Sequence, residues 1–208
     1  KGLDREEDAL KLRSVFQTIV SSNNLPFHLA TWTPRVEHKL HRWGIAGFRR
    51  IYAATFIKNS ASLGKMVAPR VAAATWSLAW NRWCTARRFQ KTATCVLGCG
   101  SGDDSAEHYF GCRVGRTAGH KHLRLHDVDY PTRKASMLGA RKFQNDEEQA
   151  RWAILVYGIY MATNRARGSP LEPRCANDAV EEVIQWMRRA TEGHTKSQAM
   201  IGRLWNAQ

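Results

Sequence analysis

Four residues with metal-ligand side chains lie within a stretch of 18 residues, and they constrain this chain more than any other feature. The pattern is Cys95-x3-Cys99-x8-His108-x3-Cys112. Three thiolates and one imidazole make the closed tetrahedral set of a structural zinc site. Gly98 and Gly100 allow the backbone to turn tightly beside the first two ligands. The four-residue step to the last cysteine places the second pair on one face of a helical turn. The sequence therefore predicts a loop folded around one zinc ion.

The cysteine count favours a metal site over disulfides. The chain has five cysteines, an odd number, and three of them cluster with a histidine, which suits a reducing compartment. Because the predicted set leaves no open coordination position, a catalytic zinc is not expected. The alternative is that the clustered cysteines are reduced core residues without an ion. Cys84 and Cys175 are predicted to be small buried residues.

The charge of the chain indicates the class of partner. Lysine and arginine number 32 against 18 acidic residues, which gives a formal net charge of +14, and the sequence pI is about 10.1. A small domain needs a net charge of only about 2–8 in magnitude for solubility. The excess therefore predicts a polyanionic partner: RNA, DNA or an anionic membrane surface. A hydrophobic content of 43% is enough for a packed core and argues against disorder throughout.

The sequence gives no indication of a membrane span or a secretory signal. No stretch reaches the roughly 18 apolar residues that a span needs, and the best candidate, residues 152–162, is flanked by Arg151 and Arg165. That segment is predicted to be a buried helix. The chain starts at Lys1, which predicts a fragment or a processed product. We expect an organellar (mitochondrial) or nuclear protein that is not secreted.

Apolar residues recur at helical spacing along most of the chain, without an alternating strand pattern or an internal repeat. We therefore predict an all-α fold, built as helical bundles with an inserted zinc-knuckle-like loop. The predicted helices cover residues 4–20, 33–44, 48–56, 69–91, 146–167, 177–187 and 200–205, with a break at 64–69 and a metal loop at 94–119. The predicted regions are an N-terminal helical region (1–91), the loop with a basic segment (92–126) and a C-terminal helical region (127–208). In the basic segment, His120, His122 and His126 are predicted to be solvated, and a second metal site is the alternative.

Basic residues recur beside aromatic residues. Arginine and lysine bind phosphates, and exposed aromatic rings stack on unpaired bases. Trp76, Trp80 and Trp83 share a face of the predicted helix 69–91 and are expected in the core instead. The candidate phosphate contacts, which flank the metal loop or lie in basic runs, are Arg49, Arg50, Arg82, Arg87, Arg88, Lys91, Arg113 and Arg116. RNA is favoured over DNA as the partner, because no helix-turn-helix or basic-zipper pattern is present.

The stretch from Trp80 to Cys112 resembles a known family. It contains WNRWCTARRFQ, a short spacer and then CVLGCGSGDDSAEHYFGC. This order is similar to the zinc-knuckle region that follows the polymerase domain in LINE-type (non-LTR) retrotransposon reverse transcriptases, over about residues 70–115. The resemblance implies a metal-ligand role for Cys95, Cys99, His108 and Cys112, and a part in handling nucleic acid. Both short gaps contain three residues here, whereas the family often has two and four.

No polymerase site accompanies this region. Asp103-Asp104 is the only adjacent aspartate pair, and it lies among glycine and serine, whereas a two-magnesium site needs a third carboxylate and a hydrophobic hairpin. Both aspartates are predicted to form a solvated turn. The sequence thus favours a non-catalytic RNA-binding subunit of a larger ribonucleoprotein, of retroelement-like origin, such as an organellar ribosome. Other proteins of that assembly would be partners, and no small-molecule substrate is expected. The alternatives are a C-terminal nucleic-acid-binding fragment of a reverse transcriptase and a protein–protein scaffold subunit.

Overall fold

The computed structural model describes residues 29–45, 50–168 and 175–205. Within these residues the chain is all-α, as the sequence predicts, and its only β-pairing is an isolated bridge between Thr94 and Asp103. The elements are α2 (Leu29–Arg42), α3 (Arg50–Met66), α4 (Pro69–Ala79), the 3₁₀ turn η1 (Arg87–Phe89), α5 (Ala106–Gly111), α6 (Arg113–Leu123), α7 (Tyr130–Met137), α8 (Asp146–Gly168), α9 (Ala176–Thr191) and α10 (Thr195–Trp205). The helix predicted at 4–20 and the candidate Arg49 lie outside the described residues. None of the described helices is long and apolar enough to cross a membrane.

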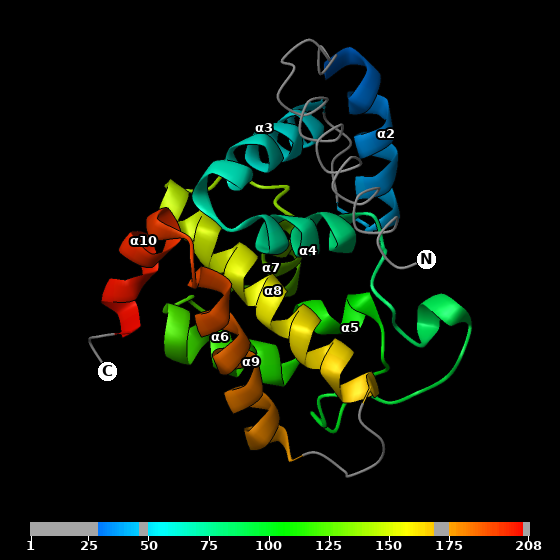
Figure 1. Ribbon diagram of the computed structural model, residues 1–208. Helices are drawn as coiled ribbons and strands as arrows, with labels where there is room; N and C mark the ends of the chain where they lie inside the picture. The colour runs from blue at the N-terminus through cyan, green and yellow to red at the C-terminus, as the bar shows by residue number, and fades with distance from the viewer. Residues whose placement is uncertain (1–28, 46–49, 169–174, 206–208) are drawn as a thin grey trace, which may run out of the picture.

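Helix α8 runs through the middle of the molecule (Figure 1). Every residue from Trp152 to Ile159 is buried, and the helix contacts α3, α4, α6, α7, α9 and α10. A helix that is apolar all round is stable only when other elements surround it. Three acidic residues, Asp146, Glu147 and Glu148, occupy its first turn, where negative charge is favourable beside the helix dipole. The prediction of a buried helix at 152–162 is confirmed.

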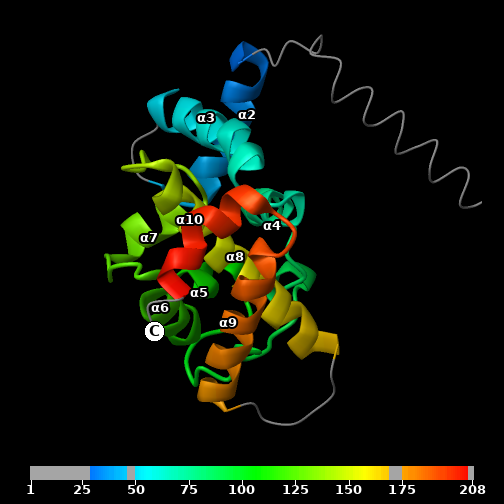
Figure 2. The same cartoon turned by 60° about the vertical axis from the view of Figure 1, so that its left-hand side comes forward.

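The other helices pack around α8 and share its core. Helices α2 and α3 lie at one end of the molecule, and α6 and α9 lie at the other (Figures 1 and 2). At Gly158 an added Cβ would come within 2.6 Å of Met187 Cγ and 2.9 Å of the Val183 carbonyl oxygen, so glycine permits the close approach of α9. A single hydrophobic cluster draws residues from all three predicted regions, for example Phe56 and Leu97 together with the residues of α8.

The helix predicted over residues 69–91 is wrong in its second half. Helix α4 ends at Ala79, and Asn81 takes a left-handed conformation with φ of +53°, which stops the helix. Trp83 then turns back into the core, is fully buried, and donates from its indole nitrogen to the Ala74 carbonyl at 3.3 Å. Trp76 is only partly buried. The basic residues of this segment therefore lie on a loop beyond α4.

Several other boundaries differ from the prediction: α10 begins at Thr195 and not at residue 200, α9 continues to Thr191, and α7 lies where no helix is predicted. Helix α2 begins at Leu29, upstream of the predicted start, with Pro34 inside it. Gly64 belongs to α3, so the break before α4 is limited to residues 67–68. The metal loop ends at Cys112, because residues 113–123 form α6. The predicted C-terminal ends of three helices hold to within a few residues: residue 44 for α2, residue 167 for α8 and residue 205 for α10.

Candidate metal centre and basic loop

The four residues predicted to bind metal lie together in the structure. The ligand atoms of Cys95, Cys99, His108 and Cys112 all lie within 4.8 Å of one another. Cys95 Sγ is 3.9 Å from Cys112 Sγ, and His108 Nε2 is 3.2 Å from Cys99 Sγ. With Zn–S and Zn–N bonds of about 2.3 and 2.0–2.1 Å, tetrahedral ligands lie roughly 3.5–3.8 Å apart. The spacing therefore fits a metal ion with tetrahedral coordination. All three thiols are buried, so the site is shielded from water.

The first two cysteines lie in a turn closed by backbone hydrogen bonds. The Cys95 N–H donates to the Gly102 carbonyl at 3.1 Å, and the Gly98 N–H donates to the Cys95 carbonyl at 3.1 Å. Gly98 has a φ of +63°, a conformation that side chains disfavour. Leu97, at the tip, is completely buried. The glycines fold the chain around the thiols, and the leucine fixes the turn to the core.

The second pair of ligands comes from α5. Its N-cap, Ser105, accepts a hydrogen bond from the His108 N–H at 3.0 Å, and Cys112 follows its last residue. Gly102 lies directly against the imidazole, because an added Cβ would be 2.2 Å from His108 Nδ1. The ring is thus held with Nδ1 toward Gly102 and Nε2 toward Cys99. Nε2 is the atom positioned to bind a metal ion.

The thiols are electrostatically coupled. Contact with Cys112, and then with His108, lowers the pKa of the Cys95 thiol to about 4, although burial acts in the opposite direction. The same contact with Cys95, together with burial, raises the pKa of the Cys112 thiol. Two buried thiolates this close repel each other, and a coordinated divalent cation removes that repulsion. The donor set therefore matches a cation that binds several thiolates at once.

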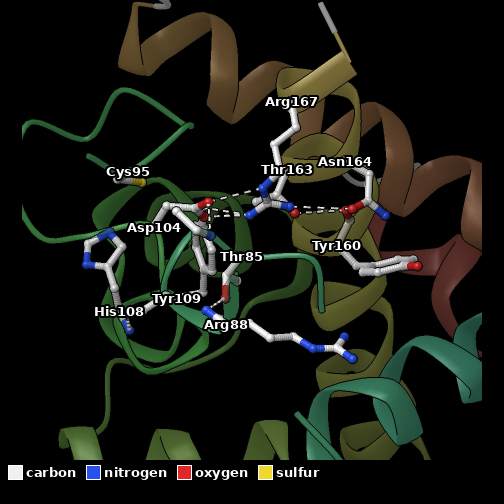
Figure 3. Close-up of polar contacts among 12 residues, drawn as sticks. Thr85, Arg88, Cys95, Asp104, His108, Tyr109, Tyr160, Thr163, Asn164 and Arg167 are labelled. Atoms are coloured by element: carbon white, nitrogen blue, oxygen red, sulfur yellow. Dashed lines mark hydrogen bonds and ion pairs between the residues drawn. The ribbon is translucent and has the colours of Figure 1, made fainter. Parts of the chain in front are cut away.

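Asp104 is buried, which corrects the prediction of a solvated turn. Its carboxylate accepts hydrogen bonds from Arg167 Nη2 at 2.5 Å, Tyr109 Oη at 2.6 Å and the Ala86 N–H at 2.8 Å (Figure 3). Burial opposes ionisation, but Arg167 and then Tyr109 outweigh it and lower the pKa of Asp104 below its usual value. Only its neighbour Asp103 is exposed. No sequence signal identifies Arg167 as a partner, since it lies 63 positions away.

Asp104 joins the metal turn to residues 82–91, which we define as the basic loop. The Arg87 N–H donates to the Asp104 carbonyl at 3.2 Å, and the Asp104 N–H donates to the Ala93 carbonyl at 2.8 Å. Thr85 is also buried. Asp104 therefore holds the loop at the start of η1 and holds the chain just beyond the loop at Ala93.

The basic side chains of the loop face solvent, whereas Trp83 and Thr85 are buried. Arg82, Arg87, Arg88 and Lys91 are all exposed. Phe89 is 56% exposed, with the Arg88 guanidinium 5.8 Å from its ring centroid. In Figure 3 the Arg88 side chain points away from Asp104. The loop thus presents four cations and one aromatic ring on a backbone that is hydrogen-bonded to Asp104.

The remaining candidate contacts lie elsewhere. Arg113 and Arg116 are exposed on α6, and Arg116 forms an ion pair with Asp127 at 2.5 Å. Helix α3 begins at Arg50, whose side chain, like Arg49, is outside the described part of the chain. The structure therefore brings together only the four candidates of the basic loop.

Three predictions about histidine and cysteine are wrong. His122 is buried, with neither ring nitrogen hydrogen-bonded, because α6 continues through residue 123 and turns it toward α9. His120 and His126 are exposed, as predicted. Cys84 and Cys175 are both exposed; Cys84 lies in the loop between α4 and η1, and Cys175 is the N-cap residue of α9.

Comparisons of the chain with protein-family models, curated proteins and solved structures find no match. Function is therefore inferred from the residues of this site.

Proposed function

We propose that this chain is a zinc-stabilised, non-catalytic RNA-binding protein that acts as a subunit of a larger ribonucleoprotein. The observation that carries the proposal is an exposed basic loop attached to a candidate metal centre through one buried carboxylate, Asp104. Ten residues of this loop contain Arg82, Arg87, Arg88 and Lys91 and no acidic residue. A fixed group of cations binds the phosphates of nucleic acid without reading its sequence.

Zinc is the metal that suits the donor set. Three thiolates and an imidazole are soft and borderline ligands, which select zinc over magnesium or calcium. Four protein donors fill a tetrahedral shell and leave no position for a substrate, so the ion would stabilise the turn. When bound, it supplies the positive charge that lets the crowded thiols ionise together.

Several features favour RNA as the polyanion. Phe89 is exposed within the basic loop, where its ring is free to stack on an unpaired base. The net charge of +14 favours a polyanionic partner over a neutral one. The resemblance to the zinc-knuckle region of LINE-type reverse transcriptases supports a retroelement-like origin, and we propose an organellar ribosome as the setting.

The test is the salt dependence of RNA binding. Binding of a fluorescent single-stranded RNA would be measured by anisotropy at several salt concentrations, for the zinc-loaded chain and for the Arg87→Gln/Arg88→Gln variant. Each lost phosphate contact should reduce the slope of log K against log salt by about 0.7. We therefore expect the double variant to reduce the slope by about 1.4 and to weaken binding across sequences.

The matched control is Lys58→Gln/Lys65→Gln, which removes the same charge from exposed positions of α3. This control should change the slope by much less. Equal effects of the two variants would show that net charge, and not the basic loop, determines binding. Phe89→Ala should weaken single-stranded RNA binding by about 1–3 kcal/mol if the ring stacks on a base.

A further inference from the structure

A cavity is lined by residues of α5, α6, α7 and α8. It has a volume of about 640 Å³ and is bounded by α6, residues 124–129, α7 and α8. In Figure 2, α6 and α7 both lie on the left-hand side of the molecule. Pockets of roughly 300–1,000 Å³ are typical for small ligands. None of the four metal ligands and no residue of the basic loop lines it.

The floor of the cavity is apolar. Trp152, Leu155 and Ile159 project from one face of α8, since they are three, four and seven positions apart. Met137 of α7 and Phe110 of α5 complete the floor. All five residues are buried in the core, so the floor is rigid. A flat or aliphatic body is the kind of group that would lie against it.

One part of the lining is cationic. Arg116 on α6 and Arg133 on α7 both pair with the carboxylate of Asp127, across the connection between the two helices. Asp127 is the only acidic residue in the lining, so this group carries two positive charges against one negative charge. The two guanidiniums share one carboxylate, and burial, followed by the charge of Arg116, lowers the pKa of Arg133, while Asp127 acts in the opposite direction. A second anion would balance the remaining positive charge.

The lining also contains hydrogen-bonding groups. Thr117 and His120 line the wall from α6, and His126 lines it from the connection. A hydrocarbon chain would leave these groups without partners, at a cost, whereas the polar edge of a nucleobase would pair with them. The lining thus combines apolar, hydrogen-bonding and cationic groups, the three kinds of group that a base, its edge and its phosphate would contact.

We infer that this cavity binds a single nucleotide, with the base on the apolar floor and the phosphate beside Arg116. The inference rests on the proposed function, because the nucleotide would be an unpaired residue of bound RNA. A free mononucleotide has the same chemistry and would occupy the same site. Protein and RNA would then meet at two places: phosphates along the basic loop and one base in the cavity.

The experiment titrates the zinc-loaded chain with adenosine and uridine 5′-monophosphates by isothermal calorimetry. We expect saturable binding of at least one mononucleotide at one site. The matching nucleoside and inorganic phosphate should each bind at least about tenfold more weakly, because each lacks one half of the contacts. Decanoate, which carries an anion on an aliphatic chain, should bind more weakly than the nucleotide. Tighter binding of decanoate, or no binding of either mononucleotide, would overturn the inference.

Three variants test the position of the ligand. Arg116→Gln should weaken mononucleotide binding at least about tenfold, and Thr117→Trp should abolish it by filling the cavity from an exposed position. Asp127→Asn should strengthen it, because the two arginines lose their competing carboxylate. The control Lys58→Gln, on α3, removes one cation elsewhere and should have no effect. Unchanged affinity in all three cavity variants would place the nucleotide elsewhere and refute the assignment.

The RNA-binding role of the basic loop and the nucleotide site in the cavity can be refuted independently. The Arg87→Gln/Arg88→Gln variant should lose affinity for long single-stranded RNA while it keeps mononucleotide binding. If that variant binds RNA normally but Thr117→Trp abolishes mononucleotide binding, the cavity assignment stands and the role of the basic loop is refuted. Zinc content and the thermal unfolding temperature of each variant confirm that it is folded before its affinity is compared.

Discussion

Gly102 and Gly100 offer a matched test of the metal centre. Both glycines have positive φ, +79° and +74° respectively. An added Cβ at Gly102 would lie 2.2 Å from Nδ1 and 2.7 Å from Cε1 of His108, whereas at Gly100 it would meet no heavy atom within 4 Å. Gly102→Ala and Gly100→Ala therefore impose the same backbone strain, but only the first displaces the imidazole.

The magnitudes follow from these contacts. A left-handed conformation costs an alanine about 1–2 kcal/mol relative to glycine, and both variants should lose that much stability. Displacement of the ring moves Nε2, which lies 3.2 Å from Cys99 Sγ. Disturbed orientation of a metal ligand typically costs about 10–100-fold in affinity, or roughly 1.4–2.8 kcal/mol. We expect this additional loss in Gly102→Ala alone.

Zinc competition with a chromophoric chelator would measure the affinity, and denaturant unfolding with and without zinc would measure the stability. Gly102→Ala should bind zinc at least about tenfold more weakly than Gly100→Ala. In the zinc-free chain the two variants should have similar stability, because the additional loss comes from the metal. Equal zinc affinities would refute the conclusion that His108 Nε2 is a ligand held in place by the Gly102 backbone.

Three further predictions concern the ion pair, the buried histidine and the thiols. Asp104→Asn should lower the free energy of unfolding by about 3 kcal/mol, since it leaves the Arg167 guanidinium without its counter-charge, and should lower the thermal unfolding temperature by roughly 6–12 °C. The double variant with Arg167→Met should lose little more stability, because the ion pair is lost only once. Burial lowers the pKa of His122 below 6.5. As pH falls below 6.5, the unfolded chain therefore binds a proton that the folded chain does not bind, and the free energy of unfolding decreases. His122→Leu should remove this decrease, as measured by denaturant unfolding of the variant and the unchanged chain at several pH values. Cys112→Ala should remove about one zinc per chain by elemental analysis, while Cys84→Ala, which removes an exposed thiol, should remove none.

The sequence predicts the metal centre well because its information is local. Cys95 and Cys99 lie within one turn, and His108 and Cys112 lie within one helical turn, so the chain separation between ligands nearly fixes their separation in space. The glycines of the loop indicate the required left-handed turns. Helix α8 is predictable for a similar reason, since its apolar stretch is long and its acidic first turn marks its start.

Features that depend on distant residues could not be predicted. Asp104 looks like a loop aspartate until Arg167 is brought to it from the end of α8. Trp83 has the helical spacing of Trp76, yet the chain leaves the helix at Asn81 because burying the indole beside Tyr109 and Tyr160 requires a turn there. In each case packing against another element outweighs the local pattern, and a single sequence does not state which element that is.

The contact between Arg167 and Asp104 also has a consequence for the order of events during synthesis. All four thiol and imidazole ligands leave the ribosome before Arg167 does, and the tyrosine that packs on Trp83 lies on the same late helix. A nascent chain ending soon after Cys112 already carries every donor atom, but the carboxylate that holds the turn to the basic loop still lacks its counter-charge. An excised peptide of residues 82–112 likewise contains every donor atom and lacks Arg167. We therefore expect the turn to be fully held only when the C-terminal half has folded against the first, and we expect an excised peptide of residues 82–112 to bind a metal ion less tightly than the whole chain.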